Sequence, residues 1–229
     1  MPVQKKAPED LTAKKALALE VIRRLKAEYP DAGCTLDYDH AWQLLVSVRL
    51  AAQCTDARVN IVVEELFAKY PSVAALAAAE PEDIEAIVKP CGLGHSKARD
   101  ISACMRMLRD KYDCRVPNTF EELLALPGVG RKSANLIMGD VFGKPAIVTD
   151  THCIRLCNKI GLVDGIKEPQ KVEMALWKII PPEEGSDLCH RFVMHGRAVC
   201  NARKPECEKC CLKDICRTAR EAAGQQAEP

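Results

Sequence analysis

The stretch LPGVGRKSANLIM, residues 126–138, contains the most informative local pattern in the chain. Apolar periodicity on both sides predicts two helices, and a proline followed by Gly128 and Gly130 predicts a tight turn between them. Arg131 and Lys132 then fall in the first turn of the second helix, where the helix macrodipole favours anions. This departure from local preference indicates function, although solvated lysines also occur in first turns.

Helical periodicity of apolar residues recurs along the chain, in residues 11–30, 40–53, 57–70, 94–112 and 171–180. Asp56 is expected to be the N-cap of the third of these helices, and Thr119 with Glu122 forms a capping-box pattern before a short one. Only KPAIVTD, residues 144–150, looks briefly strand-like, and no alternating pattern predicts a sheet. The expected fold class is therefore all-α.

Length and composition exclude several classes of protein. The 229 residues are enough to bury a core in one or two domains. No apolar run approaches the ~18 residues of a membrane span, and the N-terminal segment lacks the apolar core of a secretory signal. We therefore expect a cytoplasmic protein without membrane contact.

The net charge of +1 does not indicate a nucleic-acid partner. The charge is uneven, however, because residues 191–220 hold eight Lys and Arg against three acids.

The thirteen cysteines divide into a scattered group and a clustered one. An odd number, without an export signal, argues against a disulfide framework. Nine fall singly in apolar or helical stretches, as small buried hydrophobic residues do. The other four have the spacing C-x6-C-x2-C-x5-C, at Cys200, Cys207, Cys210 and Cys216. Four thiolates at this spacing can hold zinc or a [4Fe–4S] cluster, and the unequal loops favour iron–sulfur. Cys211 is interpreted as a spare.

Local patterns leave two interpretations open at each of the remaining positions. The glycine turn exposes backbone N–H groups that can hold a phosphate, but many helical hairpins use glycine for turn geometry alone. Lys132 could be an activated amine or a solvated lysine that contacts a phosphate, as Arg131 could. Asp150 stands where an N-cap is expected. His152 could be a neighbour of that cap or a polar anchor.

Taken together, the motifs resemble those of the endonuclease III family of helix-hairpin-helix DNA glycosylases. The resemblance rests on LPGVGRKSA (126–134), VTDTH (148–152) and the four-cysteine array (200–216), which occur in the order and spacing of that family. It extends from about Leu17 to Arg217, which is nearly the whole chain.

The resemblance implies a two-lobed architecture. A six-helix barrel would span residues 34–145 and would contain the helix-hairpin-helix motif at about 119–142. A discontinuous helical lobe, residues 1–33 and 146–229, would carry the loop of the [4Fe–4S] cluster at 200–216. Lys132 would then come from the barrel and Asp150 from the junction of the lobes.

The resemblance also implies a role for each candidate residue. Lys132 corresponds to the catalytic lysine of the family and Asp150 to its essential aspartate. The ligands of the cluster would be the four cysteines of the array. Contacts with DNA would come from the hairpin, from the histidine beside the aspartate and from a basic loop: Gly128, Val129, Gly130, Arg131, His152, Arg203 and Lys204.

Two further residues correspond to positions that enter the DNA duplex. Gln53, in LAAQCTD, matches the glutamine that fills the gap left by a flipped nucleotide. Leu93, in GLGHSKA, is the candidate for a side chain that wedges into the duplex, although Gly94 and His95 differ from some members of the family. Ser133 replaces the threonine that most members have after the lysine, a change that should not affect the chemistry.

The implied activity is base excision repair. The enzyme would remove oxidised pyrimidines from duplex DNA and would cleave the strand 3′ to the abasic site by β-elimination through a lysine Schiff base. Its partner would be double-stranded DNA with damaged pyrimidines or abasic sites. A monomer is expected, associated with the nucleoid in a bacterium or archaeon.

Three alternatives stay open. Two are a pyrimidine-dimer glycosylase and an adenine-mismatch glycosylase of the same superfamily, and the mismatch enzyme typically lacks the lysine. The third is a non-catalytic DNA-binding protein built on the same hairpin. Lys132 together with Asp150 argues against that alternative.

Overall fold

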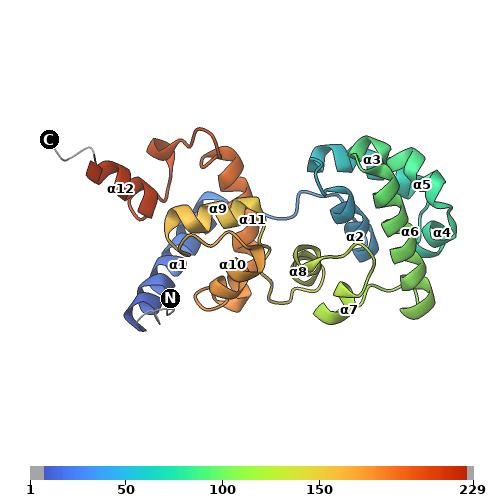
Figure 1. Cartoon of the computed structure of the whole chain (residues 1–229), viewed down its shortest axis with the longest axis horizontal. Coiled ribbons are helices and arrows are strands. Elements are labelled where there is room, and N and C mark those ends of the chain that lie inside the picture. Colours follow the sequence, from blue (N-terminus) through green and yellow to red (C-terminus); the bar gives the residue numbers. More distant parts are fainter. Residues whose placement is uncertain (1–7, 226–229) are drawn as a thin grey trace, which may run out of the picture. The chain divides into compact units, whose positions relative to one another are not determined.

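The described part of the chain, residues 8–225, consists of helices and connecting loops and contains no β-strand (Figure 1). The structure is a computed structural model, and it confirms the expected all-α class. The chain divides into two compact units, one formed by Cys34–Lys144 and the other by the segments on either side. Residues 1–7 and 226–229, which the expected cluster lobe included, lie outside the described residues. None of the described helices is long and apolar enough to cross a lipid bilayer.

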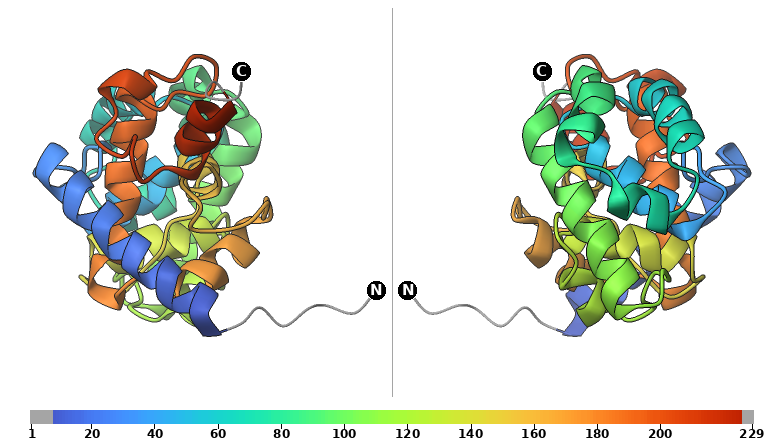
Figure 2. Two further views of the ribbon diagram at one scale, coloured as in Figure 1. Left: turned by 90° about the vertical axis from the view of Figure 1, so that its left-hand side faces the viewer. Right: turned by 90° about the vertical axis from the view of Figure 1, so that its right-hand side faces the viewer.

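The unit Cys34–Lys144 contains the hairpin motif. Its helices are α2 (Ala41–Leu50), α3 (Asp56–Lys69), α4 (Val73–Ala78), α5 (Pro81–Val88), the 3-10 helix η1 (Lys89–Cys91), α6 (Gly94–Lys111), α7 (Phe120–Leu124) and α8 (Arg131–Asp140). Helix α6 packs along α4 and α5 (Figure 2), and α2 contacts α3, α6 and α8. Most side chains of α2 are buried, as its apolar sequence predicts, so this helix is the centre of the unit.

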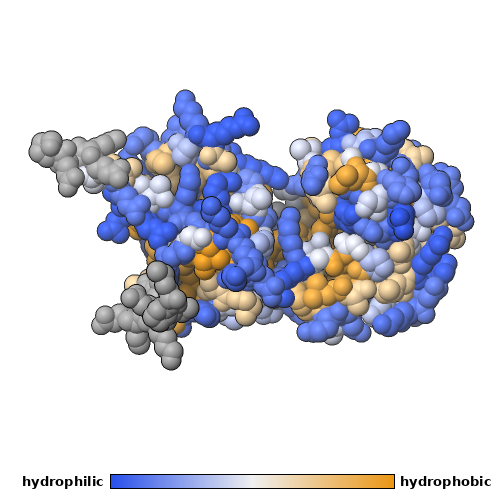
Figure 3. Space-filling view, in the orientation of Figure 1, coloured by the Kyte–Doolittle hydropathy of each residue, from blue (hydrophilic) through white to orange (hydrophobic). Residues whose placement is uncertain are grey.

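The other unit is built round α11. Its helices are α1 (Pro8–Glu28), α9 (Thr151–Ile160), α10 (Pro169–Leu176), η2 (Pro182–Glu184), α11 (Gly185–Ala198), η3 (Cys207–Lys209) and α12 (Arg217–Gln225). Helix α11 packs against α1 and α9, and α12 packs against α9. The apolar stripe of α1 is buried at Val21 and Leu25, and α11 buries Phe192 completely. Polar residues cover most of the face of each unit in Figure 3.

Two local predictions differ from the structure, namely the N-cap of α3 and the strand-like segment 144–150. The N-cap of α3 is Thr55 rather than Asp56, because Thr55 has the extended backbone of a cap and its side chain accepts a hydrogen bond from the Arg58 amide. Asp56 is instead the first helical residue, and its carboxylate accepts a hydrogen bond of 2.6 Å from the Thr35 hydroxyl. Thr119 caps α7 as predicted.

The segment 144–150 is extended but pairs with no strand among the described residues. It is held instead by α11: Ala146 and Ile147 are fully buried, and the Val148 amide donates to the Cys189 sulfur at 3.2 Å. A Cβ at Gly185 would lie 2.4 Å from the Ala146 carbonyl oxygen, so glycine permits this close approach. The apolar run therefore reflects burial against a helix rather than a place in a sheet.

The turn between α7 and α8 has the geometry that its sequence predicts. The Val129 amide donates to the Leu126 carbonyl at 3.1 Å, and Gly128 has a φ of +76° at the third position of the turn. These features define a type II turn, which requires a left-handed residue at that position. A Cβ on Gly128 would also lie 2.9 Å from the Asp100 Cβ, whereas a Cβ on Gly130 would meet nothing within 4 Å.

We therefore expect the two glycines to differ in their effect on stability. Gly128→Ala should lower the free energy of unfolding by about 2 kcal/mol or more, because strain and overlap add. In thermal unfolding this corresponds to a fall in Tm of about 5 °C. Gly130→Ala is the matched control and should shift Tm by less than about 2 °C. Equal losses in the two variants would show that Gly128 is not the residue that the turn constrains.

Candidate functional site

The N-terminus of α8 presents hydrogen-bond donors that no side chain of its own cap satisfies. Its N-cap is Gly130, which has no side chain, and no side-chain cap is present. The caps Thr55, Ser72 and Thr119 of neighbouring helices accept such a hydrogen bond. The first amides of a helix have no acceptor within the helix. The start of α8 is therefore suited to bind an anionic group such as a phosphate.

The two cations of this first turn have different surroundings. The Lys132 side chain is exposed. The Arg131 guanidinium lies over the Phe120 ring, 4.9 Å from its centroid, and so connects α8 with α7. Arg131 therefore stabilises the hairpin itself. The Val129 amide, which was expected to face DNA, is engaged within the turn.

An ion pair packs against the Gly128 turn of the hairpin. Arg49, near the end of α2, donates through Nε to the Asp100 carboxylate of α6 at 2.7 Å. The atoms closest to Gly128 belong to these two side chains. Neither residue was singled out from the sequence, because the pair joins residues 51 positions apart. The local signal is limited to Arg49, which is a charged residue in the otherwise apolar pattern of α2.

Gln53 and Leu93 lie at the tips of two loops of the same unit. Both side chains are exposed, and Leu93 is 58% exposed. Both have a left-handed backbone, with φ values of 58° and 53°. A non-glycine residue pays an energetic cost in this conformation, so its presence suggests a functional constraint.

Asp150 is the N-cap of α9, in the other unit. Its Oδ1 accepts a hydrogen bond of 2.7 Å from the Cys153 amide, and the residue is partly buried. Asp150 is therefore an N-cap, as its position in the sequence predicts. Because an ionised carboxylate has two oxygens, capping through Oδ1 is compatible with an electrostatic role towards a substrate.

His152 is packed against α11. A Cβ on Gly196 would lie 2.3 Å from the His152 Nδ1, so glycine is needed for this contact. Arg155 Nη2 lies 3.2 Å from the same nitrogen and donates to the Cys200 carbonyl at 2.8 Å. His152 is therefore a polar anchor, and this network joins the start of α9 to the four-cysteine loop.

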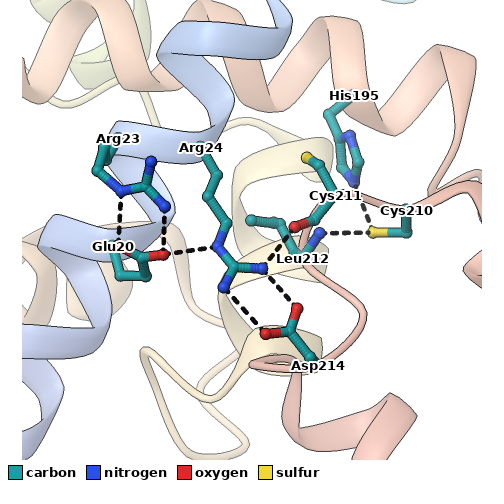
Figure 4. Close-up of polar contacts among 8 residues, drawn as sticks. All are labelled: Glu20, Arg23, Arg24, His195, Cys210, Cys211, Leu212 and Asp214. Atoms are coloured by element: carbon teal, nitrogen blue, oxygen red, sulfur yellow. Dashed lines mark hydrogen bonds and ion pairs between the residues drawn. The ribbon is translucent and has the colours of Figure 1, made fainter.

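All four cysteines of the array line one cavity of about 50 Å³. Cys211 does not line it and lies next to α1, where its carbonyl accepts a hydrogen bond of 2.8 Å from Arg24 (Figure 4). No three His, Cys, Asp or Glu side chains of the described chain converge as they would round a single metal ion. Four thiols that line one cavity could serve as ligands of an iron–sulfur cluster, whose iron atoms are each bound by a different thiolate.

The four cysteines differ in exposure, because Cys207 is exposed whereas Cys200, Cys210 and Cys216 are half-buried. Burial raises the pKa of the Cys210 thiol to about 11 and also raises the pKa of the Cys200 thiol. The Cys210 sulfur accepts a hydrogen bond from the Leu212 amide and lies 3.4 Å from His195 Nε2 (Figure 4). The thiolate forms of Cys200 and Cys210 would therefore depend on the positive charge of bound metal.

The basic loop between the first two cysteines is shaped by its own hydrogen bonds. Asn201 donates to the Lys204 carbonyl at 2.6 Å and accepts from the Lys204 amide at 2.7 Å. The Glu206 amide closes the loop on the Val199 carbonyl at 2.9 Å. Arg203 and Lys204 are exposed on it, as a contact with a polyanion requires.

The predicted site residues thus fall into two groups. The hairpin, Lys132, Gln53 and Leu93 belong to the unit Cys34–Lys144. The other group, Asp150, His152, Arg203, Lys204 and the four cysteines, belongs to the second unit. Sequence patterns did not point to Lys97, which is completely buried beside the loops of Gln53 and Leu93.

Comparison with known proteins identifies the relatives of this chain. Residues 46–182 match the family described as "HhH-GPD superfamily base excision DNA repair protein". An endonuclease III from Synechocystis sp. is 42% identical over 210 residues, covering 91% of this chain and 95% of that protein. An endonuclease III from Escherichia coli is 38% identical over 202 residues, covering 88% and 95%.

Solved structures agree with these relatives. A trapped endonuclease III–DNA covalent intermediate has a TM-score of 0.86 and 39% identity, covering 91% of this chain and 98% of that chain. A thermostable thymine-DNA glycosylase has a TM-score of 0.80 at 22% identity, which shows a shared fold alone. This chain belongs to the endonuclease III family, within the HhH-GPD superfamily of base excision DNA repair proteins.

Proposed function

We propose that this enzyme is a bifunctional DNA glycosylase and abasic-site lyase that acts on oxidised pyrimidines in duplex DNA. The observation that carries the proposal is Lys132, an exposed amine in the first turn of a helix whose cap is a glycine. An amine beside donors suited to a backbone phosphate can reach the sugar attached to that phosphate. The enzyme would act as a monomer on nucleoid DNA in the cytoplasm.

In the proposed reaction, the neutral Lys132 amine attacks C1′ of the damaged nucleotide. The C1′–N bond breaks, and its electron pair leaves with the base, which takes up a proton. The sugar ring opens to give a Schiff base between Nζ and C1′. Loss of a proton from C2′ then expels the 3′ phosphate by β-elimination, and water finally releases the amine from the cleaved product.

Asp150 would stabilise the positive charge that develops on the sugar as the base leaves. A carboxylate directed at that charge lowers the barrier by electrostatic stabilisation. Its cap bond with Cys153 supports this role, because it fixes the direction of the side chain. The damaged nucleotide must first leave the duplex, which costs less for a damaged base than for an intact one.

DNA affinity would come mainly from phosphate contacts. The chain has only ten Phe, Trp and Tyr residues, so stacking on aromatic side chains can contribute little. The donors at the start of α8 and the exposed Arg203 and Lys204 are suited to phosphates. Gln53 would occupy the gap left by the flipped nucleotide, and Leu93 would wedge into the duplex.

Cys200, Cys207, Cys210 and Cys216 would hold a [4Fe–4S] cluster. Its role would be structural, because Leu212 is the only fully apolar residue of the loop 200–216 that is buried. A loop with so little apolar burial needs metal ligation or hydrogen bonds to keep one conformation. Arg155 and Arg24 bind the carbonyls of Cys200 and Cys211 and connect the loop to α9 and α1.

Two adjacent cysteines provide a matched test of the cluster. Protein purified without oxygen should contain about four iron atoms per chain and little zinc. Cys210→Ser should lose most of the iron, because Cys210 lines the cavity, whereas Cys211→Ser should retain it. Metal analysis and visible absorption measure both results. Stoichiometric zinc, or iron loss in Cys211→Ser, would show that the ligand assignment is incorrect.

Lys132 can be tested by trapping its imine. Borohydride should reduce the Schiff base and give a covalent adduct between the enzyme and a duplex that contains an oxidised pyrimidine. Lys132→Gln should lose both the adduct and strand cleavage, because the amide is not a nucleophile. Lys111→Gln, which removes an exposed lysine at the end of α6, is the control and should behave as the wild type. An adduct at wild-type yield in Lys132→Gln would identify another amine as the nucleophile.

Asp150 can be tested separately from Lys132. Asp150→Asn removes the charge but keeps an oxygen that can cap α9, so thermal stability should change little. Base excision should fall about a hundredfold or more, in line with the loss of one electrostatic stabiliser. Cleavage of a pre-formed abasic site should fall much less, because no base has to leave. Equal losses on the two substrates would contradict the proposed role.

A further inference from the structure

Lys97 is a completely buried lysine in α6. Its Nζ donates hydrogen bonds to the carbonyl oxygens of Leu50 and Cys91, each at 2.8 Å. Burial lowers the pKa of this lysine from its ordinary value, so the site has an energetic cost. A cost of this kind is expected to be retained only where the two hydrogen bonds achieve something that an apolar side chain cannot.

Both acceptors stand at the ends of helices. Leu50 is the last residue of α2, and Cys91 is the last residue of the 3-10 helix η1. Carbonyls at a C-terminus have no partner within the helix and carry the negative end of its dipole. The Lys97 ammonium therefore joins two helix ends that are distant in the sequence.

The two loops of the candidate DNA surface begin directly after these carbonyls. Gln53 lies three residues after Leu50, and Leu93 lies two residues after Cys91. Both tips are exposed and have the left-handed backbone described above. Such a backbone persists only where the surrounding structure holds it in place. Next to these two loops, burial and the neighbouring Cys54 thiol raise the pKa of the Cys91 thiol to about 11.

The filling of space in the core does not explain the choice of lysine at position 97. Lys97 lies on the same face of α6 as Ile101, Cys104 and Leu108, all of which are buried. An apolar residue would fill the space at position 97 equally well. It would, however, leave the carbonyls of Leu50 and Cys91 without their donor, and the two loops without their shared attachment.

We propose that Lys97 is a positioning residue for entry into the DNA duplex, where it holds the Gln53 and Leu93 loops in one mutual arrangement. This inference rests on the roles assigned to those two side chains in the proposed function. It predicts that removal of the ammonium weakens recognition of the damaged site without weakening the phosphate contacts.

The test compares two DNA duplexes for each full-length variant. One carries a tetrahydrofuran abasic-site analogue, and the other is undamaged. Lys97→Met keeps the length and apolar stem of the side chain but removes the donor. We define the ratio as the Kd for the undamaged duplex divided by the Kd for the duplex with the analogue. In Lys97→Met this ratio should fall roughly tenfold, in line with the loss of charged hydrogen bonds. The Kd for the undamaged duplex should stay within about twofold of the wild-type value. The fluorescence of 2-aminopurine opposite the analogue should fall with the ratio, since it reports unstacking there.

Leu108→Ala is the matched control for general destabilisation. Leu108 is fully buried on the same face of α6, three helical turns from Lys97. At a temperature where circular dichroism shows both variants folded, Leu108→Ala should keep the wild-type ratio. A ratio that Lys97→Met leaves unchanged, or that Leu108→Ala lowers equally, would overturn the proposal.

Variants of the loop tips separate this inference from the proposed function. Gln53→Ala and Leu93→Ala should each lower the ratio. Adding Lys97→Met to Leu93→Ala should lower it by less than the product of the single effects.

If neither tip variant lowers the ratio, the proposed roles of the tips are incorrect. If the tips lower it and Lys97→Met does not, only the role of Lys97 is incorrect. If neither Lys97→Met nor Lys97→Gln folds at low temperature, Lys97 is a structural residue and the proposal fails.

Discussion

The last turn of α2 is connected to α6 by an ion pair and by a lysine hydrogen bond, and the features of this unit that are proposed to face DNA lie at that connection. Arg49 pairs with Asp100 beneath the Gly128 turn, and the next residue, Leu50, accepts a hydrogen bond from Lys97. Because α2 is buried on nearly every side, its position is fixed by the core. The hairpin and the two loops are therefore attached to the same rigid helix, as a surface that must match the DNA backbone would require.

The second unit uses arginine for a similar purpose. Arg155 connects the start of α9 with the Cys200 carbonyl, and Arg24 connects α1 with the Cys211 carbonyl and with Asp214 at 2.9 Å (Figure 4). Planar guanidinium groups can bind several oxygens at once, which suits them to hold a loop that has little apolar surface to bury. Asp150 at the start of α9 is thereby linked through the protein to the loop that the cluster would order.

The parts of the structure that follow from nearby residues could be predicted from the sequence. The all-α class, the buried α2, the Thr119 cap and the Gly128 turn each depend on residues within a few positions of one another. The cap of α3 was assigned one residue too late, because Thr55 and Asp56 are both good caps and only the backbone decides between them. Residues 144–150 look like a strand because burial against a helix and burial in a sheet select the same side chains.

Contacts between distant residues could not be predicted in this way. Arg49 and Asp100, or Lys97 and Leu50, are about fifty positions apart, and their pairing depends on how α2 packs on α6. A signal was nevertheless present for Lys97. Its position continues the apolar stripe of Ile101, Cys104 and Leu108, so a lysine there is expected either to be buried or to interrupt the stripe.

The left-handed backbone has a different meaning at Gly128 than at the two loop tips. At Gly128 this conformation coincides with a close contact to Asp100, so glycine satisfies both constraints. Gln53 and Leu93 have the same backbone handedness but are exposed, so glycine would relieve the strain there at no steric cost. A larger side chain at each tip agrees with the roles proposed for Gln53 and Leu93. Strain at these two positions, offset by the buried hydrogen bonds of Lys97, is therefore what we expect of side chains that must project from the surface in a fixed direction.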